Sequence, residues 1–173
     1  MKAPMITAII ETKNDEVRLA HALAALVPAA TEGIVRDVVV IDHGSSDGTV
    51  VVADAAGCAI LNAMNFNGDP RQRAASEARG DWLLFLSPSV TLAPNWLAET
   101  MAFIDHALVT GKAQERVATF RGGRIDSGWI GWLRSFVNSG DGLLIAKTAY
   151  LASVSSSPSS AASRVSGARR GAA

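Results

Sequence analysis

Residues 38–49 read VVVIDHGSSDGT, and this stretch decides the fold of the chain. Its first four residues form a short, continuous apolar run, which is typical of a strand buried on both faces. The strand ends at Asp42, and the glycine- and serine-rich residues that follow predict a turn. Ser46 or Asp47 can cap a helix over residues 49–56. The stretch therefore predicts a strand, a turn and a helix in that order.

Strands and helices alternate through the first 110 residues. Apolar runs predict further strands over 5–10, 58–61 and 82–86. Helical periodicity or an initial proline predicts helices over 19–27, ended by Pro28 and Gly33, over 70–78, and from Pro94 to about 110, with Leu97, Met101, Ile104 and Leu108 on one face. This alternation indicates an α/β fold, in which a mostly parallel sheet carries helices on both faces. Ligands bind such sheets beyond the carboxyl ends of the strands, here residues 11–15, 42–48 and 87–90.

The second part of the chain is less regular. Apolar runs predict strands over 117–120 and 143–146, and apolar residues at helical spacing predict a helix from Trp129 to Val137. Beyond Val154 the composition changes to Ser, Ala, Gly and Arg, which is typical of a disordered segment. We expect one domain over residues 1–154 and a disordered tail over 155–173.

Composition narrows the classes of function. The 173 residues carry 16 basic and 16 acidic side chains, so no net charge draws the chain to nucleic acid. The single cysteine, Cys58, lies in an apolar stretch and is expected to act as a small hydrophobe. The chain has neither a leader-like apolar segment near Met1 nor an apolar run of about 18 residues. These features predict a cytoplasmic location.

Asp42 and the loop after it are the strongest candidates for a binding site. A carboxylate at the end of a strand can accept hydrogen bonds from a base or a ribose, and the loop can present backbone N–H groups to a polar ligand. A tight turn with a helix cap would explain the same residues without any ligand. The residues alone leave both interpretations open.

Three strings together resemble the family 2 glycosyltransferases of the Rossmann-like GT-A fold. They are residues 6–15, ITAIIETKND, residues 38–49, and residues 71–86, RQRAASEARGDWLLFL. The resemblance covers roughly residues 5–110 and implies a site for a nucleotide-diphosphate sugar. It implies that the base and ribose lie near Thr12, Asn14 and Asp42, with Gly44 and Ser45 in the adjoining loop. Arg71 or Arg73 would face the diphosphate, unless each belongs to a solvated helix face.

The chain departs from this family at two places. The family carries Asp-x-Asp after the fourth strand, and its carboxylates hold a divalent cation, whereas this chain has Ser87-Pro88-Ser89. Ser87 and Ser89 are neutral, so the resemblance does not extend to a manganese or magnesium site, and we expect no metal ligand among these residues. An inverting transferase also needs a carboxylate base. Asp141 is the best candidate for that base, with Asp126 second.

Two hypotheses remain. In the first, the chain transfers a sugar from a nucleotide-diphosphate donor to an acceptor hydroxyl, and Arg71, Arg73 or Arg121 stabilises the diphosphate. In the second, it is a pseudoenzyme that binds a nucleotide or a partner protein. Family analogy suggests a lipid-linked or envelope glycan as acceptor, at the cytoplasmic face of a membrane. A dinucleotide-dependent oxidoreductase is excluded because no Gly-x-Gly-x-x-Gly follows the first strand.

Overall fold

The computed structural model describes residues 5–65, 67–113, 116–121, 124–129 and 142–155. The strands are β1 (Ile6–Thr12), β2 (Val35–Asp42), β3 (Ala59–Asn62), β4 (Trp82–Leu86), β5 (Arg116–Arg121), β6 (Arg124–Trp129) and β7 (Gly142–Ala146). The helices are α1 (Glu16–Thr31), α2 (Thr49–Ala55), α3 (Pro70–Glu77), α4 (Trp96–Val109) and α6 (Lys147–Ser155), and a 3-10 turn, η1, covers Ala63–Asn65. No helix within these ranges is long and apolar enough to cross a membrane.

The strands form one sheet in the order β3-β2-β1-β4-β7-β5-β6. The first four strands of that order are parallel to one another. Each remaining neighbour pair is antiparallel, so β5 runs in the direction of the parallel strands while β7 and β6 run against them. The predicted α/β class with a mostly parallel sheet is confirmed.

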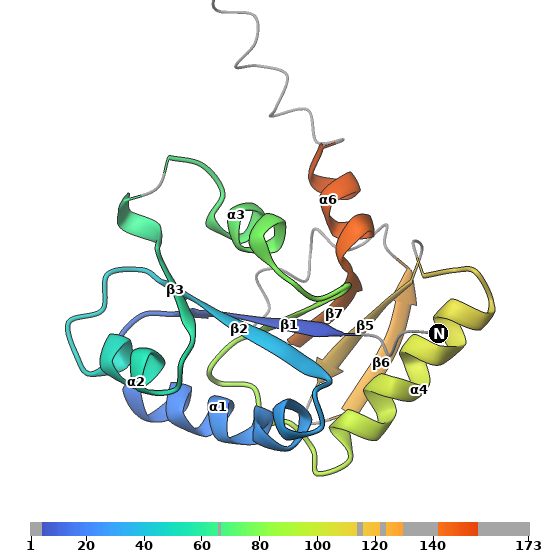
Figure 1. Cartoon of the computed structure of the whole chain (residues 1–173), viewed down its shortest axis with the longest axis horizontal. Helices are drawn as coiled ribbons and strands as arrows, with labels where there is room; N and C mark the ends of the chain where they lie inside the picture. The colour runs from blue at the N-terminus through green and yellow to red at the C-terminus, as the bar shows by residue number, and fades with distance from the viewer. Residues whose placement is uncertain (1–4, 66, 114–115, 122–123, 130–141, 156–173) are drawn as a thin grey trace, which may run out of the picture.

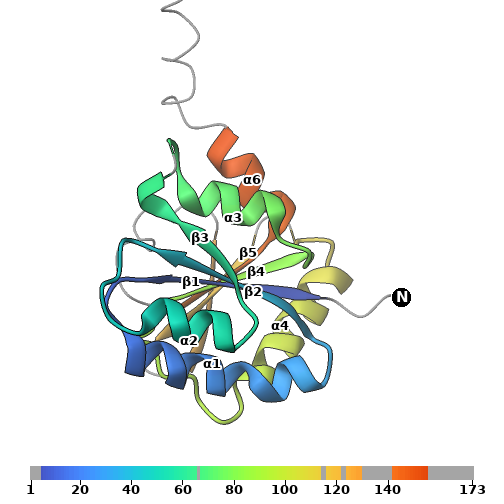
Figure 2. The ribbon, with the colours of Figure 1, turned by 60° about the vertical axis from the view of Figure 1, so that its left-hand side comes forward.

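Helices cover both faces of the sheet. Figures 1 and 2 show α1, α2 and α4 on one face and α3 and α6 on the other. Strands enclosed in this way should be apolar along their whole length. In β1 the side chains of Ile6, Ala8, Ile9 and Ile10 are all at most 1% exposed. The continuous apolar runs in the sequence therefore correspond to strands buried on both faces.

Two helices differ from their predictions. Pro28 was expected to end the first helix, but α1 continues to Thr31. The buried Ala29 packs in the core beyond the proline, and Gly33 ends the segment in a left-handed conformation with φ of 74°. In α4 the buried residues are Trp96, Thr100, Ile104 and Ala107. Of the predicted face, Ile104 is buried and Leu97 packs partly buried against the core, whereas Leu108 is 41% exposed, because the buried stripe lies mostly one position earlier.

The sequence missed two elements in the second part of the chain. The helix predicted from Trp129 is wrong at its first residue, since Trp129 ends strand β6, and its other residues lie outside the described ranges. The helix α6 was not expected at all, and it packs Ala149 and Tyr150 into the core. The predicted tail lies outside the described residues except for Ser155, which ends α6.

Candidate functional site

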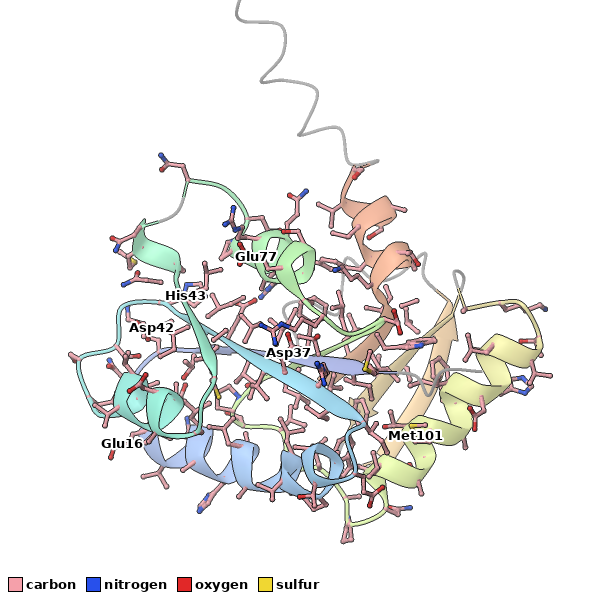
Figure 3. The ribbon with its side chains drawn as sticks, in the orientation of Figure 1. Glu16, Asp37, Asp42, His43, Glu77 and Met101 are labelled. Carbon is pink, nitrogen blue, oxygen red and sulfur yellow. The ribbon has the colours of Figure 1, made fainter. Side chains whose placement is uncertain are left out.

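The carboxyl ends of β1, β2 and β4 lie side by side at one edge of the sheet. Thr12 is the register partner of Asp42, and both side chains are 3% exposed. Ser87 follows β4 directly, on the other side of β1. Figure 3 shows Asp42 and His43 at this end of the sheet. The fold thus brings the three predicted binding segments to one place.

Asp42 organises the loop that follows it. Its carboxylate accepts hydrogen bonds from the backbone N–H of Gly44 at 3.1 Å and of Ser45 at 3.2 Å. Gly44 adopts a left-handed conformation with φ of 81°, which a residue with a side chain rarely adopts. These contacts confirm the tight turn in this loop and leave the question of a ligand open. An ionised carboxylate can accept about four hydrogen bonds, so these contacts leave Asp42 able to accept more.

Asn14 joins the loop after β1 to the loop after β2. Its side-chain oxygen accepts the N–H of Ser46 at 2.7 Å, and its own N–H donates to the Ser45 hydroxyl at 2.9 Å. Asn14 has φ of 54°, a left-handed conformation that asparagine tolerates better than most residues. Its amide side chain is thus committed to holding the two loops together.

The start of α2 is fixed by acidic side chains from both loops. Gly48 is the N-cap residue, so the predicted caps Ser46 and Asp47 are wrong as N-cap positions, yet the Asp47 carboxylate still accepts the N–H of Thr49 at 3.0 Å. The hydroxyl of Thr49 also donates to Asp47 and lowers the pKa of that carboxyl below its usual value. The Glu16 carboxylate accepts the N–H of Gly48 at 3.1 Å. Several backbone N–H groups of the loop therefore donate hydrogen bonds within the protein. A ligand would contact mainly side chains.

A second polar cluster joins the carboxyl ends of β1 and β2 to α3, and the pairing within it was not predicted from the sequence. The Arg71 guanidinium donates through Nε and Nη2 to the Glu11 carboxylate. The Nε2 atom of His43 lies 3.2 Å from the same carboxylate. Burial lowers the pKa of Arg71, and the nearby Tyr150 phenol partly offsets that shift. Glu11 could have been noticed as a charged residue at the end of an otherwise apolar strand.

The two predicted arginines of α3 have different surroundings. Arg71 lies against Glu11 at the carboxyl end of β1, close to the predicted nucleotide site. Arg73 is about half exposed and forms an ion pair with Glu77, one turn along the same helix, at 2.5 Å. These contacts agree with a solvated helix face for Arg73, whereas Arg71 lies at the carboxyl end of β1.

The segment that replaces the metal-binding acids is a short turn. The Ser87 hydroxyl accepts the N–H of Ser89 at 3.3 Å, and the Ser87 carbonyl accepts the N–H of Val90 at 3.0 Å. Hard divalent cations need anionic oxygen ligands, which serine hydroxyls do not supply. Within the described ranges no three His, Cys, Asp or Glu side chains are grouped so that they could hold a metal ion. The residues present do not fit a cation held in the Asp-x-Asp manner.

A groove of about 600 Å³ adjoins this turn. It lies between α1 and residues 88–92, and its walls include Arg18, His21, Ser89 and Thr91. Arg18 lies in the first turn of α1, and its Nη1 atom lies 3.1 Å from the Asp15 carboxylate. Arg18 has no distinguishing signal in the sequence, since only the fold brings it beside the turn after β4.

Three predicted residues cannot be placed in the site. Asp141 lies outside the described residues, so its assignment as a base remains a prediction. Asp126 lies in strand β6 and Arg121 in strand β5, and the structure describes only the backbone of these two residues.

Comparison with known proteins agrees with this geometry. The model of a family described as Glycosyl transferase family 2 matches residues 7–139. No curated protein matches the chain. Among solved structures, glucosyl-3-phosphoglycerate synthase from Mycobacterium tuberculosis in complex with uridine diphosphate is similar, at 19% identity and a TM-score of 0.57. The same synthase with Mn2+, UDP-glucose and glycerol 3-phosphate gives the same values.

The likeness to these structures shows a shared GT-A fold. In both cases it covers 84% of this chain and 57% of the synthase chain. The synthase solved without a named ligand is similar at 15% identity, with a TM-score of 0.54 and 58% of that chain covered. The chain thus spans less than two thirds of the length of these structures.

Proposed function

Since the chain belongs to glycosyl transferase family 2, we propose that it binds a nucleotide-diphosphate sugar at the carboxyl ends of β1 and β2. It would transfer the sugar to an acceptor hydroxyl. The observation that carries this proposal is the pairing of Thr12 with Asp42 at the end of two buried, neighbouring strands. Parallel α/β sheets bind ligands at such ends.

The groups available for the nucleotide are mostly side chains. The Asp42 carboxylate can still accept hydrogen bonds from a base edge or a ribose, beyond those from Gly44 and Ser45. The buried Thr12 hydroxyl makes no hydrogen bond within the described structure, so it can supply a donor near Asp42 if the site opens around a ligand. Uridine diphosphate is the first nucleotide to test, because the synthase structures contain it or its glucose ester.

Transfer also requires a base and a stabilised leaving group. Asp141 is proposed as the base that takes the proton of the acceptor hydroxyl. Ser87 and Ser89 do not fit a metal ion, so positive side chains would have to stabilise the diphosphate. The acceptor remains a hypothesis, with a lipid-linked or envelope glycan at the cytoplasmic face of a membrane suggested by family analogy.

A second candidate function is nucleotide binding without transfer. The replacement of two metal-binding acids by serines favours this pseudoenzyme, because it removes the family's usual way of neutralising the leaving group. The two functions differ in turnover. Release of nucleoside diphosphate from a nucleotide sugar, abolished by Asp141→Asn while binding persists, would favour the transferase.

Calorimetric titration with UDP and GDP tests the proposed site. We expect one of them to bind, and Asp42→Asn to weaken that binding at least about tenfold, the loss of one hydrogen bond to a charged group. Asp54→Asn, which removes the same charge from the exposed side of α2, is the matched control and should leave the affinity unchanged. Folded protein that binds neither nucleotide would contradict the proposal, as would equal affinities for the two variants.

A further inference from the structure

The groove between α1 and the turn after β4 is lined by basic side chains and by part of the segment that replaces the family's metal-binding acids. Its lining contains two basic side chains, Arg18 and His21, and no carboxylate from the part of the chain that the structure describes. It also contains Ser89, the second of the two serines that stand where the family has acids. Basic side chains therefore lie beside the position at which the family holds a cation.

Arg18 is suited to bind phosphate oxygens. Its side chain is 67% exposed, and the contact with Asp15 involves one nitrogen of the guanidinium. A guanidinium has five N–H donors in a planar fork that matches the oxygens of a phosphate, so several donors can still reach an anion. The groove volume of about 600 Å³ falls in the range of ordinary ligand pockets.

The groove is linked to the proposed nucleotide site through the start of α1. Asp15, which contacts Arg18, donates its N–H to the hydroxyl of Thr49, the first residue of α2, at 2.9 Å. Ser89 follows β4, and β4 and β2 flank β1 on opposite sides. Neighbouring strands lie about 4.8 Å apart, so the distance from the β2 end to the β4 end is about 10 Å. That distance suits a nucleoside diphosphate whose base lies near Asp42.

We infer that this groove binds the diphosphate of the donor, with Arg18 supplying positive charge in place of the metal ion used elsewhere in the family and with His21 beside it as a further hydrogen-bonding group. The inference rests on the proposed function. When the bond between the anomeric carbon and the diphosphate oxygen breaks, that oxygen takes the electron pair and the acceptor oxygen bonds to the carbon. The acceptor proton passes to a carboxylate base. The guanidinium donors stabilise the charge gained by the leaving group.

Titrations of the full chain with UDP, UMP, GDP, GMP and inorganic pyrophosphate test the inference. Arg18→Ala should weaken binding of the preferred nucleoside diphosphate about tenfold, the loss of one charge-assisted hydrogen bond, and should change the monophosphate affinity less than about twofold. Arg36→Ala removes the same charge from the start of β2, at the opposite edge of the sheet, and should change neither affinity. Manganese should change the diphosphate affinity less than about twofold.

The outcomes separate the inference from the proposed function. Diphosphate binding that Arg18→Ala leaves unchanged, or that manganese strengthens about tenfold, would overturn the inference and leave the nucleotide site intact. Pyrophosphate binding that depends on Arg18, with no nucleotide bound, would support the anion site and contradict the nucleotide function. Folded protein that binds neither nucleotide nor pyrophosphate would overturn both.

Discussion

The side-chain oxygen of Asn14 accepts the backbone N–H of Ser46 at 2.7 Å, and this bond joins the loops that follow two neighbouring strands. Asn14 also forms a second hydrogen bond to the same loop, in which its own backbone N–H donates to the Ser45 hydroxyl. The two loops therefore form one unit at the carboxyl edge of the sheet. A change in either loop should alter both the stability of this edge and the site that it forms.

Asn14→Ala should lower the free energy of unfolding by about 2 kcal/mol. Alanine loses the hydrogen bond to Ser46 and is strained in a left-handed conformation, and each loss costs about 1 kcal/mol. Asn14→Gly accepts that conformation and should cost about 1 kcal/mol. Denaturant unfolding of the three proteins measures these differences. Equal stability of the alanine and glycine variants would contradict the strain contribution.

Glu11→Gln should destabilise the protein by about 1–3 kcal/mol, since it weakens a charge-assisted pair that is about three-quarters buried. Glu77→Gln is the matched control, because its partner Arg73 and Glu77 itself are about half exposed, and it should cost less than about 0.5 kcal/mol. Denaturant unfolding at neutral pH compares the two variants. Losses of similar size would show that Glu11 does not hold Arg71 in a distinct environment.

Tyr150 should titrate at unusually high pH. Burial raises its pKa to about 12, with a smaller contribution from Asp69. Because the pKa is higher in the folded state, the stabilisation is fully present below pH 10 and is lost as the pH rises toward 12, by about 3 kcal/mol in total. Tyr150 is the single tyrosine of the chain, so tyrosinate absorbance reports it alone.

The titration should be followed with circular dichroism in parallel, so that unfolding is seen directly. A folded protein whose tyrosine ionises with a midpoint near 10 would contradict the buried position of Tyr150. Tyr150→Phe should remove most of the loss of stability between these pH values.

Gly80→Ala should destabilise the protein by about 3 kcal/mol, because an added Cβ would lie 2.5 Å from the backbone nitrogen of Thr7. The backbone of β1 cannot move away without disturbing the sheet. Gly57→Ala is the control: its φ is 72° and nothing lies within 4 Å of the added Cβ, so only about 1 kcal/mol of strain is expected. If the two variants unfold at the same denaturant concentration, the close approach of Gly80 to β1 is wrong.

The parallel half of the fold was predictable because its strands are buried on both faces. Runs such as Trp82–Leu86 are apolar throughout, and the predicted bounds of β4 match the structure. The antiparallel half was harder to predict. The strand β6, Arg124–Trp129, has mixed polarity and gives no clear period, and α6 is a short helix whose apolar residues do not form a single stripe.

The candidate site was predictable where a single strand end determines it. Asp42 and Thr12 follow from the strand bounds, since parallel strands place their carboxyl ends together. The pairing of Glu11 with Arg71 joins residues 60 positions apart, and the groove at Arg18 joins α1 to the turn after β4. Such contacts depend on how helices pack on the sheet, which periodicity alone does not specify.

The most direct test of the nucleotide site is an NMR titration of the isotope-labelled protein with the nucleotide that binds. We predict that the largest changes in backbone amide signals occur at Gly44, Ser45 and Ser46, and that Asp42→Asn reduces them. Changes confined to α4, or no change in folded protein at saturating nucleotide, would contradict a site at the carboxyl ends of β1 and β2.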